Sequence, residues 1–357
     1  MNNNGFSLLR YLLDLNQDVD LLLFEDDEIG HSSHFSIKND TWSYEKWSNN
    51  IISLSAVNSY GQALSSNTLC SIILYVAYYL RRIMRSQNAV FTKPAKRSNV
   101  KEFKEKLMNY DFLIGSGATP AILKSMNLKL DIFFAYSLGV EYFEEEYFKL
   151  YTQSKNPLIR YISQKMSDLQ IQGIKDARVC LNTEFTATKE AFDKIKVNTE
   201  PLHLPIVYPF EEANREIISI ETRKILEEIN SMKDKFILVS HARHQWVRPK
   251  NIDSSVWEML SKNNDFIIIA YKNFLEQRPL SNSLLVLFKY GEDFPASMKL
   301  CSELGLDDKV RWMPNTPRKE ILEIIEKSSI GLGEFYSEDV MWGGTGWEIL
   351  SKGKPLI

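Results

Sequence analysis

The chain has 357 residues, of which 44% are hydrophobic and 25% are charged, and its formal net charge is −3. This length exceeds one ordinary domain and predicts two, and the composition is typical of a globular protein in water. The weakly acidic balance and the lack of a nucleic-acid motif argue against a nucleic-acid partner. Cys70, Cys180 and Cys301 are far apart and lack metal-ligand spacing, which predicts a reducing compartment without disulfides.

Targeting signals are the next feature of the sequence. The start of the chain, residues 1–5, is polar and lacks the pattern of a signal peptide. The most apolar run, 69–80, is shorter than the roughly 20 residues that a spanning helix needs, and Arg81 and Arg82 follow it. We expect a core helix there and a cytoplasmic protein. The alternative is a peripheral helix on the inner face of the cell membrane.

Helix-like and strand-like runs alternate along the first half of the chain. Helices are predicted over 6–15 and 120–126, and strands over 19–24, 111–117, 130–135 and 177–182. This β-α-β alternation predicts an α/β fold with mostly parallel sheets. Two prolines in 204–210 and a polar, helix-prone stretch over 211–233 then mark a domain boundary. We divide the chain into domains 1–212 and 213–357.

The second half repeats the alternation and resembles half of a doubly wound nucleotide-binding fold. Strands are predicted over 236–240, 266–270, 284–288, 310–313 and 330–333, and helices over 252–260, 295–304 and 317–327. Gly305 is expected to end its helix as a C′ glycine. No G-x-G-x-x-G follows the first strand, and G-x-x-x-x-G-K-[ST], H-E-x-x-H and G-x-S-x-G are all missing. These absences disfavour dinucleotide, Walker-type, zinc-protease and serine-hydrolase sites.

The glycine-rich segment near the end of the sequence is the strongest candidate site. Residues 343–357 predict a loop, a short helix and the start of a strand. Gly343, Gly344 and Thr345 can offer N–H groups and a hydroxyl to a diphosphate at the helix N-terminus. Glu348 lies one turn into that helix, where it can accept hydrogen bonds from the hydroxyls of a ribose or another sugar.

Two further segments follow predicted strands, where ligands bind in open α/β sheets. After 236–240, Arg243 can bind phosphate oxygens with two donors and Lys250 can supply a point charge. After 284–288, Gly291 allows close approach of another backbone. A solvated basic loop and an ordinary turn are the alternatives for these two segments.

Together these segments resemble the GT-B glycosyltransferases, in particular the family 4-like branch that builds bacterial surface polysaccharides. The run G-G-T-G-x-E-x-L-x-x-G-K-P-L-I from Gly343 is similar to the donor motif of that branch. Four further parts of the chain are similar to other motifs of that branch. They are Arg243-x-x-Trp246 with Lys250, the strand that leads to Gly291, the segment 304–314 and the segment 110–136. The resemblance implies two Rossmann-like domains that face a central cleft, with 1–212 on the acceptor side and 213–357 binding the nucleotide-sugar donor.

The resemblance also implies an activity. The donor would be a UDP- or GDP-linked sugar, and the acceptor a saccharide or a lipid-linked acceptor in capsule, O-antigen or exopolysaccharide synthesis. Transfer would retain the anomeric configuration and require no cofactor and no metal. The implied diphosphate ligands are Arg243, Lys250, Gly343, Gly344 and Thr345, and the implied nucleoside and ribose ligands are Glu348, Gly291, Trp312, Met313 and Pro314.

The acceptor side and the catalytic groups are less defined. His31 and His34 follow one strand end and Tyr136 to Gly139 another, so His31, His34, Tyr136 and Gly139 are candidate acceptor contacts. A solvated turn is the alternative for the two histidines. No catalytic nucleophile can be assigned from the sequence.

The sequence departs from the pattern of the family in two places and at both ends. Val340 stands where many members carry a second glutamate, eight positions before Glu348, and Asn251 replaces a glycine. The resemblance implies chain before residue 1 and after residue 357, so we expect a fragment or a truncated variant. Two alternatives stay open: an inactive relic or partner subunit that only binds nucleotide sugar, and a sugar-nucleotide epimerase of the same architecture.

Overall fold

A computed structural model describes most of the chain. The residues that it describes are 4–24, 37–54, 97–135, 157–182, 186–202, 206–210, 219–232, 234–250, 254, 257–258, 261–278, 282–335 and 343–357. Within this part of the chain, no helix combines the length and the apolar character that crossing a membrane requires. The apolar run 69–80 and most of the predicted helix 252–260 lie outside the described residues.

The chain forms two compact units. The first, here the C-terminal unit, comprises Met1–Val19, His31–Asn50 and Pro205–Ile357. The second, here the middle unit, comprises Asp20–Gly30 and Ile51–Leu204.

The middle unit is built on two parallel sheets. One sheet has the order β3 (Ile114–Gly115), β4 (Ile132–Phe134), β5 (Val179–Asn182) and β6 (Glu200–Pro201), and the other pairs β1 (Leu21–Phe24) with β2 (Ile51–Leu54). Its helices are α5 (Arg97–Leu107), α6 (Thr119–Ser125), α8 (Pro157–Asp176) and α9 (Thr186–Lys194). The predicted strands at 19–24, 130–135 and 177–182 and the helix at 120–126 are therefore confirmed.

Helices α6 and α8 are in backbone contact. A Cβ atom on Gly173 would lie 2.2 Å from the carbonyl oxygen of Pro120, so only glycine fits there. Gln170 crosses the same contact: its Oε1 accepts from the amide of Ala121 at 3.1 Å, and its Nε2 donates to the carbonyl of Gly117 at 2.9 Å. These two hydrogen bonds give partners to the amide of Ala121 and the carbonyl of Gly117, which would otherwise be buried without partners at the start of α6.

Gly173→Ala is expected to lower the free energy of unfolding by about 1–3 kcal/mol, because the added methyl group forces two backbones apart. Gln172→Ala, at the exposed neighbouring position of α8, is the control and should stay within about 0.5 kcal/mol of wild type. Urea denaturation followed by circular dichroism measures both. Equal stability of the two variants would contradict the close contact.

The sheet of the C-terminal unit has a doubly wound strand order. Its order is β10 (Ile330–Gly331), β7 (Phe236–Ser240), β8 (Ser283–Phe288) and β9 (Val310–Met313), with every pair parallel. Leu356 pairs in parallel with Gly331 and so extends the sheet beyond β10. From β7 the chain therefore adds strands first in one direction and then, from β10 onward, in the other. The order reverses between β7 and β10, as it does in doubly wound folds.

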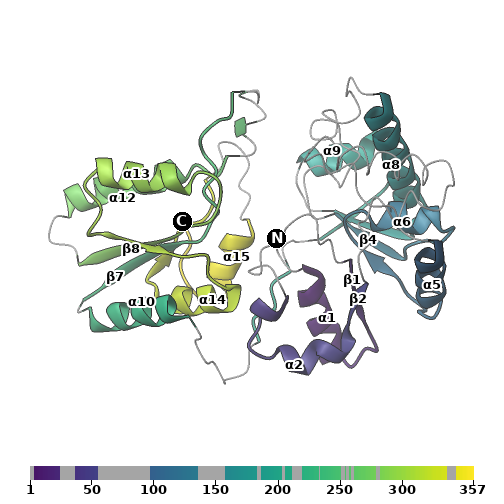
Figure 1. The fold of residues 1–357 in the computed structure, drawn as a ribbon, viewed down its shortest axis with the longest axis horizontal. Helices are drawn as coiled ribbons and strands as arrows, with labels where there is room; N and C mark the ends of the chain where they lie inside the picture. Colours follow the sequence, from purple (N-terminus) through teal and green to yellow (C-terminus); the bar gives the residue numbers. More distant parts are fainter. Residues whose placement is uncertain are drawn as a thin grey trace. The chain divides into compact units, whose positions relative to one another are not determined.

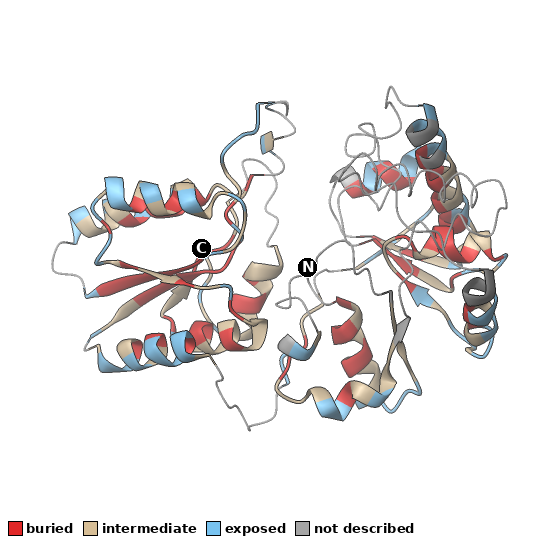
Figure 2. Ribbon diagram, in the orientation of Figure 1, coloured by how far each residue is buried: buried red, intermediate tan, exposed pale blue. Residues whose placement is uncertain are grey.

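Helices cover both faces of this sheet (Figure 1). The helices on one face are α12 (Asn264–Gln277) and α13 (Phe294–Glu303), and those on the other are α10 (Ile220–Ser231), α14 (Arg318–Lys327) and α15 (Gly344–Ser351). Every residue of β8 is buried, as expected of a parallel strand covered on both sides (Figure 2). Leu285 and Leu287 pack toward α12 and α13, whereas Leu284 and Val286 pack toward the other helices.

One predicted element of this unit is wrong. The run 266–270 was expected to be a strand, but it lies inside α12. Ile267, Ile268 and Tyr271 are buried, whereas Phe266 and Ile269 are 57% and 42% exposed, which is the spacing of a helix with one buried face. A short apolar run does not by itself distinguish a strand from a helix, and the length of the whole segment decides.

The other strands predicted in this half, at 236–240, 284–288, 310–313 and 330–333, are confirmed within their core residues. Gly305 follows α13 with φ +66, which confirms the C′ glycine.

The N-terminal segments of the C-terminal unit pack on residues 206–210. The segments comprise α1 (Asn4–Asp14), η2 (Ile37–Asn39), α2 (Tyr44–Trp47) and η3 (Ser48–Asn50). The ring of Tyr208 contacts the rings of Tyr11 and Trp47, with centroids 5.1 and 5.9 Å apart. The guanidinium of Arg10 lies 4.4 Å from the centroid of the Tyr208 ring.

The compact units thus group residues 1–19 and 31–50 with the second half of the chain. The predicted division at 212/213 instead keeps them with the first half. The physical cause of the difference is burial between residues about 200 positions apart, which local patterns do not reveal: the hydroxyl of Tyr11 donates to the carbonyl of Val207 at 2.9 Å. Which half binds donor and which binds acceptor stays a prediction.

Candidate functional site

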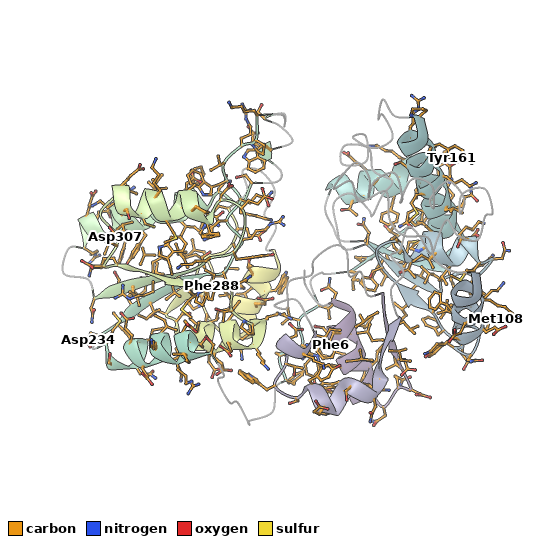
Figure 3. All side chains as sticks on the ribbon, in the orientation of Figure 1. Phe6, Met108, Tyr161, Asp234, Phe288 and Asp307 are labelled. Carbon is orange, nitrogen blue, oxygen red and sulfur yellow. The ribbon has the colours of Figure 1, made fainter. Side chains whose placement is uncertain are left out.

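The candidate site lies at the carboxyl ends of β7 and β10, where the strand order reverses. In open α/β sheets, ligands bind outside the carboxyl ends of the strands at this point. In Figure 3, Asp234 and Asp307, which precede strands, lie at the opposite end of the sheet from Phe288, the last residue of β8. Beyond the carboxyl ends, β7 continues into His241 and Arg243.

Helix α15 packs directly on β10. A Cβ atom on Gly331 would lie 2.4 Å from Cγ2 of Ile349, so the glycine allows the helix to approach the strand. The helix begins at Gly344 with Gly343 as its N-cap, which confirms the predicted short helix. The first amide groups of a helix have no acceptor within it, and its dipole favours negative charge at this end.

Three buried side-chain atoms at the end of β7 and in the first turn of α15 have no hydrogen-bond partner within the described part of the chain. They are Oγ of Ser240, Nδ1 of His241 and Oγ1 of Thr345. Ser240 ends β7, His241 follows it, and Thr345 lies in the first turn of α15. Since leaving one buried polar group unpaired costs about 1–3 kcal/mol, these three atoms are candidate contacts for a bound polar group.

A row of buried charges, here the charge relay, runs through Glu348. Oε2 of Glu348 accepts from Nε2 of His241 at 2.7 Å, and its Oε1 accepts from Nε of Arg318 at 2.8 Å. Nη1 of Arg318 also donates to Oδ1 of Asp40 at 2.7 Å, and Nη2 of Arg10 lies 3.8 Å from the second oxygen of Asp40. Both carboxylate oxygens of Glu348 therefore have protein donors, and these contacts do not supply the ribose contact that the motif resemblance implies.

The charge states in the relay follow from its geometry. Burial alone would raise the pKa of Glu348, but the charge of Arg318 and the hydrogen bond from His241 outweigh it and lower this pKa to about 2. Burial acts to lower the pKa of Arg318, but the charges of Glu348 and Asp40 raise it above its ordinary value. Glu348 is thus ionised and can only accept, so the proton of the His241–Glu348 hydrogen bond lies on Nε2.

The relay predicts a pH dependence of stability. The folded-state pKa of Glu348, about 2, lies below the unfolded value of 4.5, so its contribution is complete above pH 4.5 and is lost as the pH falls toward 2. In Glu348→Gln, urea denaturation should show a loss of a few kcal/mol at pH 7 and a smaller further loss between pH 4.5 and 2 than in wild type. Glu228→Gln, which breaks the half-exposed ion pair with Arg311, is the control. An equal slope in wild type and Glu348→Gln would contradict the assignment.

A second ion pair lies beside the N-cap of α15. Nζ of Lys262 lies 2.6 Å from Oε2 of Glu334, and the two side chains are 14% and 11% exposed. A Cβ atom on Gly343 would lie 2.6 Å from the same oxygen, so this glycine leaves room for the carboxylate of Glu334. Burial raises the pKa of the Tyr290 hydroxyl, an effect that the charge of Arg243 opposes and the charge of Glu334 increases. The charges of Arg243 and Glu334 thus both act on Tyr290, and the carboxylate of Glu334 lies beside Gly343.

The loop after β7 is tied to α13 and to the turn before it. Oδ2 of Asp293 accepts from the amides of Trp246 and Val247 at 2.7 and 2.9 Å. Oγ of the buried Ser297 bonds both Nδ1 of His244 and Nε1 of Trp246, each at 2.8 Å. These contacts fix the path of the loop from which His241 and Arg243 project.

Gly291 and His244 take structural positions in this arrangement. Gly291 has φ +100, and a Cβ atom on it would lie 2.3 Å from the carbonyl oxygen of His244. The close backbone approach expected at Gly291 is therefore made by the His244 loop. Burial lowers the pKa of His244 to about 4, although the charge of Asp293 acts to raise it. His244 is neutral at pH 7 and is not a cationic ligand.

The remaining predicted ligands are placed as follows. Arg243 and Lys250 are both exposed on the loop after β7. Trp312 is half-buried, with its ring centroid 5.3 Å from that of His244. Met313 is buried, and its carbonyl accepts from the amide of Lys289 at 2.8 Å; the carbonyl of Pro314 accepts from the hydroxyl of Thr316 at 2.9 Å.

The structure thus joins His241 to Glu348 of α15, and it leaves Arg243 exposed on the loop after β7. Sequence reasoning missed Asp40, Arg318, Lys262 and Glu334, because each is recognised only through a partner far away in the chain. The candidates His31, His34, Tyr136 and Gly139, and the departure at Val340, lie outside the described residues. Among the residues that the structure does describe, no group of three or more histidine, cysteine, aspartate or glutamate side chains could hold a metal ion.

Comparisons with known proteins give distant structural likenesses. No protein-family model and no curated protein sequence matches the chain. A sucrose-phosphate synthase from Thermosynechococcus elongatus is similar, with 14% identity and a TM-score of 0.42, over 74% of this chain and 62% of that one. The chain thus spans less than two thirds of that protein. The UDP-GlcNAc 2-epimerase of Methanocaldococcus jannaschii, solved with UDP-GlcNAc and UDP, is similar with 11% identity and a TM-score of 0.31, over 86% of this chain and 74% of that one. Likenesses this weak do not assign the chain to a family.

Proposed function

We propose that the chain is a GT-B glycosyltransferase whose C-terminal unit binds the diphosphate of a nucleotide-sugar donor, UDP- or GDP-linked. The observation that carries the proposal is the set of unpartnered buried atoms at the end of β7 and the start of α15: Oγ of Ser240, Nδ1 of His241 and Oγ1 of Thr345. They lie at the sheet edge where doubly wound folds bind ligands.

A diphosphate meets the chemical demands of these groups. Its oxygens accept hydrogen bonds from the hydroxyls of Ser240 and Thr345 and from the first amides of α15, where the helix dipole favours an anion. A protonated Nδ1 of His241 would donate to a phosphate oxygen while Nε2 stays bonded to Glu348. Arg243, at the exposed side of the same edge, adds a cation with several donors.

The same groups would assist the reaction. Breaking the bond between the sugar and the diphosphate leaves additional negative charge on the leaving group. Fixed donors aimed at that charge stabilise the transition state more than the ground state. The catalytic part of the proposal is therefore electrostatic stabilisation of the departing diphosphate by α15, His241 and Arg243.

The finer parts of the proposal rest on the motif resemblance of residues 243–250, 304–314 and 343–357. They are a saccharide or lipid-linked acceptor of polysaccharide biosynthesis, and retention at the anomeric carbon. A cytoplasmic location, with peripheral contact to the inner face of the membrane, belongs to the same set.

Arg243→Ala should weaken the binding of UDP or GDP by about 10- to 100-fold, since a hydrogen bond to a charged group contributes about 1.5–3 kcal/mol. Isothermal titration calorimetry at fixed ionic strength measures this. Arg248→Ala, another exposed arginine on the same loop, is the matched control and should bind as wild type does. Unchanged affinity in Arg243→Ala, or an equal loss in both variants, would remove Arg243 from the site.

A panel of UDP- and GDP-sugars, incubated with the protein and followed by mass spectrometry, separates the proposal from its alternatives. We expect slow release of UDP or GDP, accelerated by a suitable acceptor. Conversion of the donor into an epimer without release would indicate an epimerase instead. Tight binding without any turnover would indicate a non-catalytic binding protein.

A further inference from the structure

The charge relay connects the candidate site to a segment far away in the sequence. Asp40, which directly follows η2, and Arg318, at the start of α14, both have largely buried side chains, with exposed fractions of 1% and 15%. Behind them Arg10 of α1 is 2% exposed. In front of them stand Glu348 and His241, at 7% and 5%. The signs of the charges alternate along the row, so that the two arginines and the two carboxylates balance.

The guanidinium of Arg318 is divided between two carboxylates. Its Nε donates to Glu348 and its Nη1 to Asp40, at 2.8 and 2.7 Å. A guanidinium that faces a single carboxylate tends to bind both of its oxygens through two parallel hydrogen bonds. Asp40 thus holds Arg318 at Nη1, which fixes the orientation in which Nε reaches Oε1 of Glu348 while Oε2 bonds His241.

The bond to Glu348 in turn determines what His241 offers to a ligand. Because Nε2 donates to an ionised carboxylate, the neutral ring has its proton on Nε2 and a free lone pair on Nδ1. Nδ1 is buried and has no partner among the described residues. Among the described residues, the charged group bonded to the ring is Glu348 of α15, which is bonded in turn to Arg318 of α14 and, through it, to Asp40.

We infer that Asp40 is a positioning residue for the candidate site, which acts through Arg318 and Glu348 to hold the ligand-free His241 as the Nε2–H tautomer, so that Nδ1 is the nitrogen that takes up a proton and donates to the ligand. The inference rests on the proposed function for the nature of the ligand, a nucleoside diphosphate. The segment 37–50 then supports the site through Asp40, without itself touching the ligand.

A purely structural role is the rival explanation. In that case Asp40 only attaches the N-terminal segments to α14, and its loss lowers stability while the ring of His241 keeps its tautomer. The tautomer of His241 is therefore the measurement that separates the two roles.

The test compares wild type with Asp40→Asn, which keeps the shape of the side chain and removes its charge. Nitrogen-15 chemical shifts of the histidine rings, assigned with a His241→Gln variant, report the tautomer in the ligand-free protein. Glu228→Gln, which breaks an ion pair of the same unit away from the relay, is the control. Calorimetry with UDP and with GDP completes the comparison.

We expect a protonated Nε2 and an unprotonated Nδ1 in wild type and in Glu228→Gln. In Asp40→Asn the ring should become a mixture of tautomers, and the affinity for the nucleoside diphosphate should fall about tenfold, the equivalent of one weakened charged hydrogen bond. An unchanged tautomer in a folded Asp40→Asn protein, or a proton on Nδ1 in wild type, would overturn the inference.

A second variant covers the case in which Asp40→Asn does not fold. Arg318→Lys keeps the positive charge but replaces the planar fork by a single ammonium group, and it should disturb the His241 tautomer in the same way. An unchanged tautomer in this variant likewise overturns the inference. A wild-type protein that binds neither UDP nor GDP refutes the proposed donor site alone, because the tautomer comparison needs no ligand.

Discussion

The arrangement of the candidate site depends on one buried carboxylate. Glu348 is 5% exposed and has an arginine on one oxygen and a histidine on the other. A carboxylate buried in this way is tolerated only when charged and hydrogen-bonded partners compensate for its lost hydration. The partners are Arg318 of α14 and His241, which follows β7. Their bonds to Glu348 therefore hold α14, the end of β7 and α15 together.

The bonds of Glu348 also explain how the polar groups of the candidate site come to lie at one edge of the sheet. Glu348 lies in α15 and His241 follows β7 directly, so their bond sets where the start of the helix meets the end of the strand. Gly331 lets α15 approach β10, and Gly343 makes room for the Glu334–Lys262 pair. The amides at the start of α15 and the side chains of Ser240, His241 and Thr345 are thereby gathered at one sheet edge. Such preorganised donors are the kind of feature that stabilises charge developing on a departing anion.

Local patterns in the sequence anticipated most of the C-terminal unit. The apolar runs of β7 and β8, the glycine after α13 and the glycine loop before α15 each carry their signal within a few residues. The run 266–270 misled because five apolar residues fit a strand as well as the buried face of a helix, and the full length of α12 decided the outcome. The packing of Tyr208 on α1 was not visible in the sequence, because it joins residues about 200 positions apart.

The candidate site, like the fold, could be predicted only in part from the sequence. Strand ends and glycines placed Arg243, Gly343 and Glu348 near the ligand-binding edge, because topology alone brings such positions together. The partners of those residues could not be predicted. Asp40 and Lys262 are ordinary charged residues until the fold places them beside Arg318 and Glu334. For Glu348, the fold adds bonds to Arg318 and His241, and the ribose contact stays a prediction.

The most direct test of this account is an experimental structure of the chain with UDP or GDP bound. The account predicts that the diphosphate lies at the N-terminus of α15, with a phosphate oxygen within hydrogen-bond distance of Nδ1 of His241, and with Glu348 still bonded to Arg318 and to Nε2 of His241. A diphosphate bound elsewhere on the sheet, or a Glu348 that leaves Arg318 and His241 to bind the ribose, would contradict it.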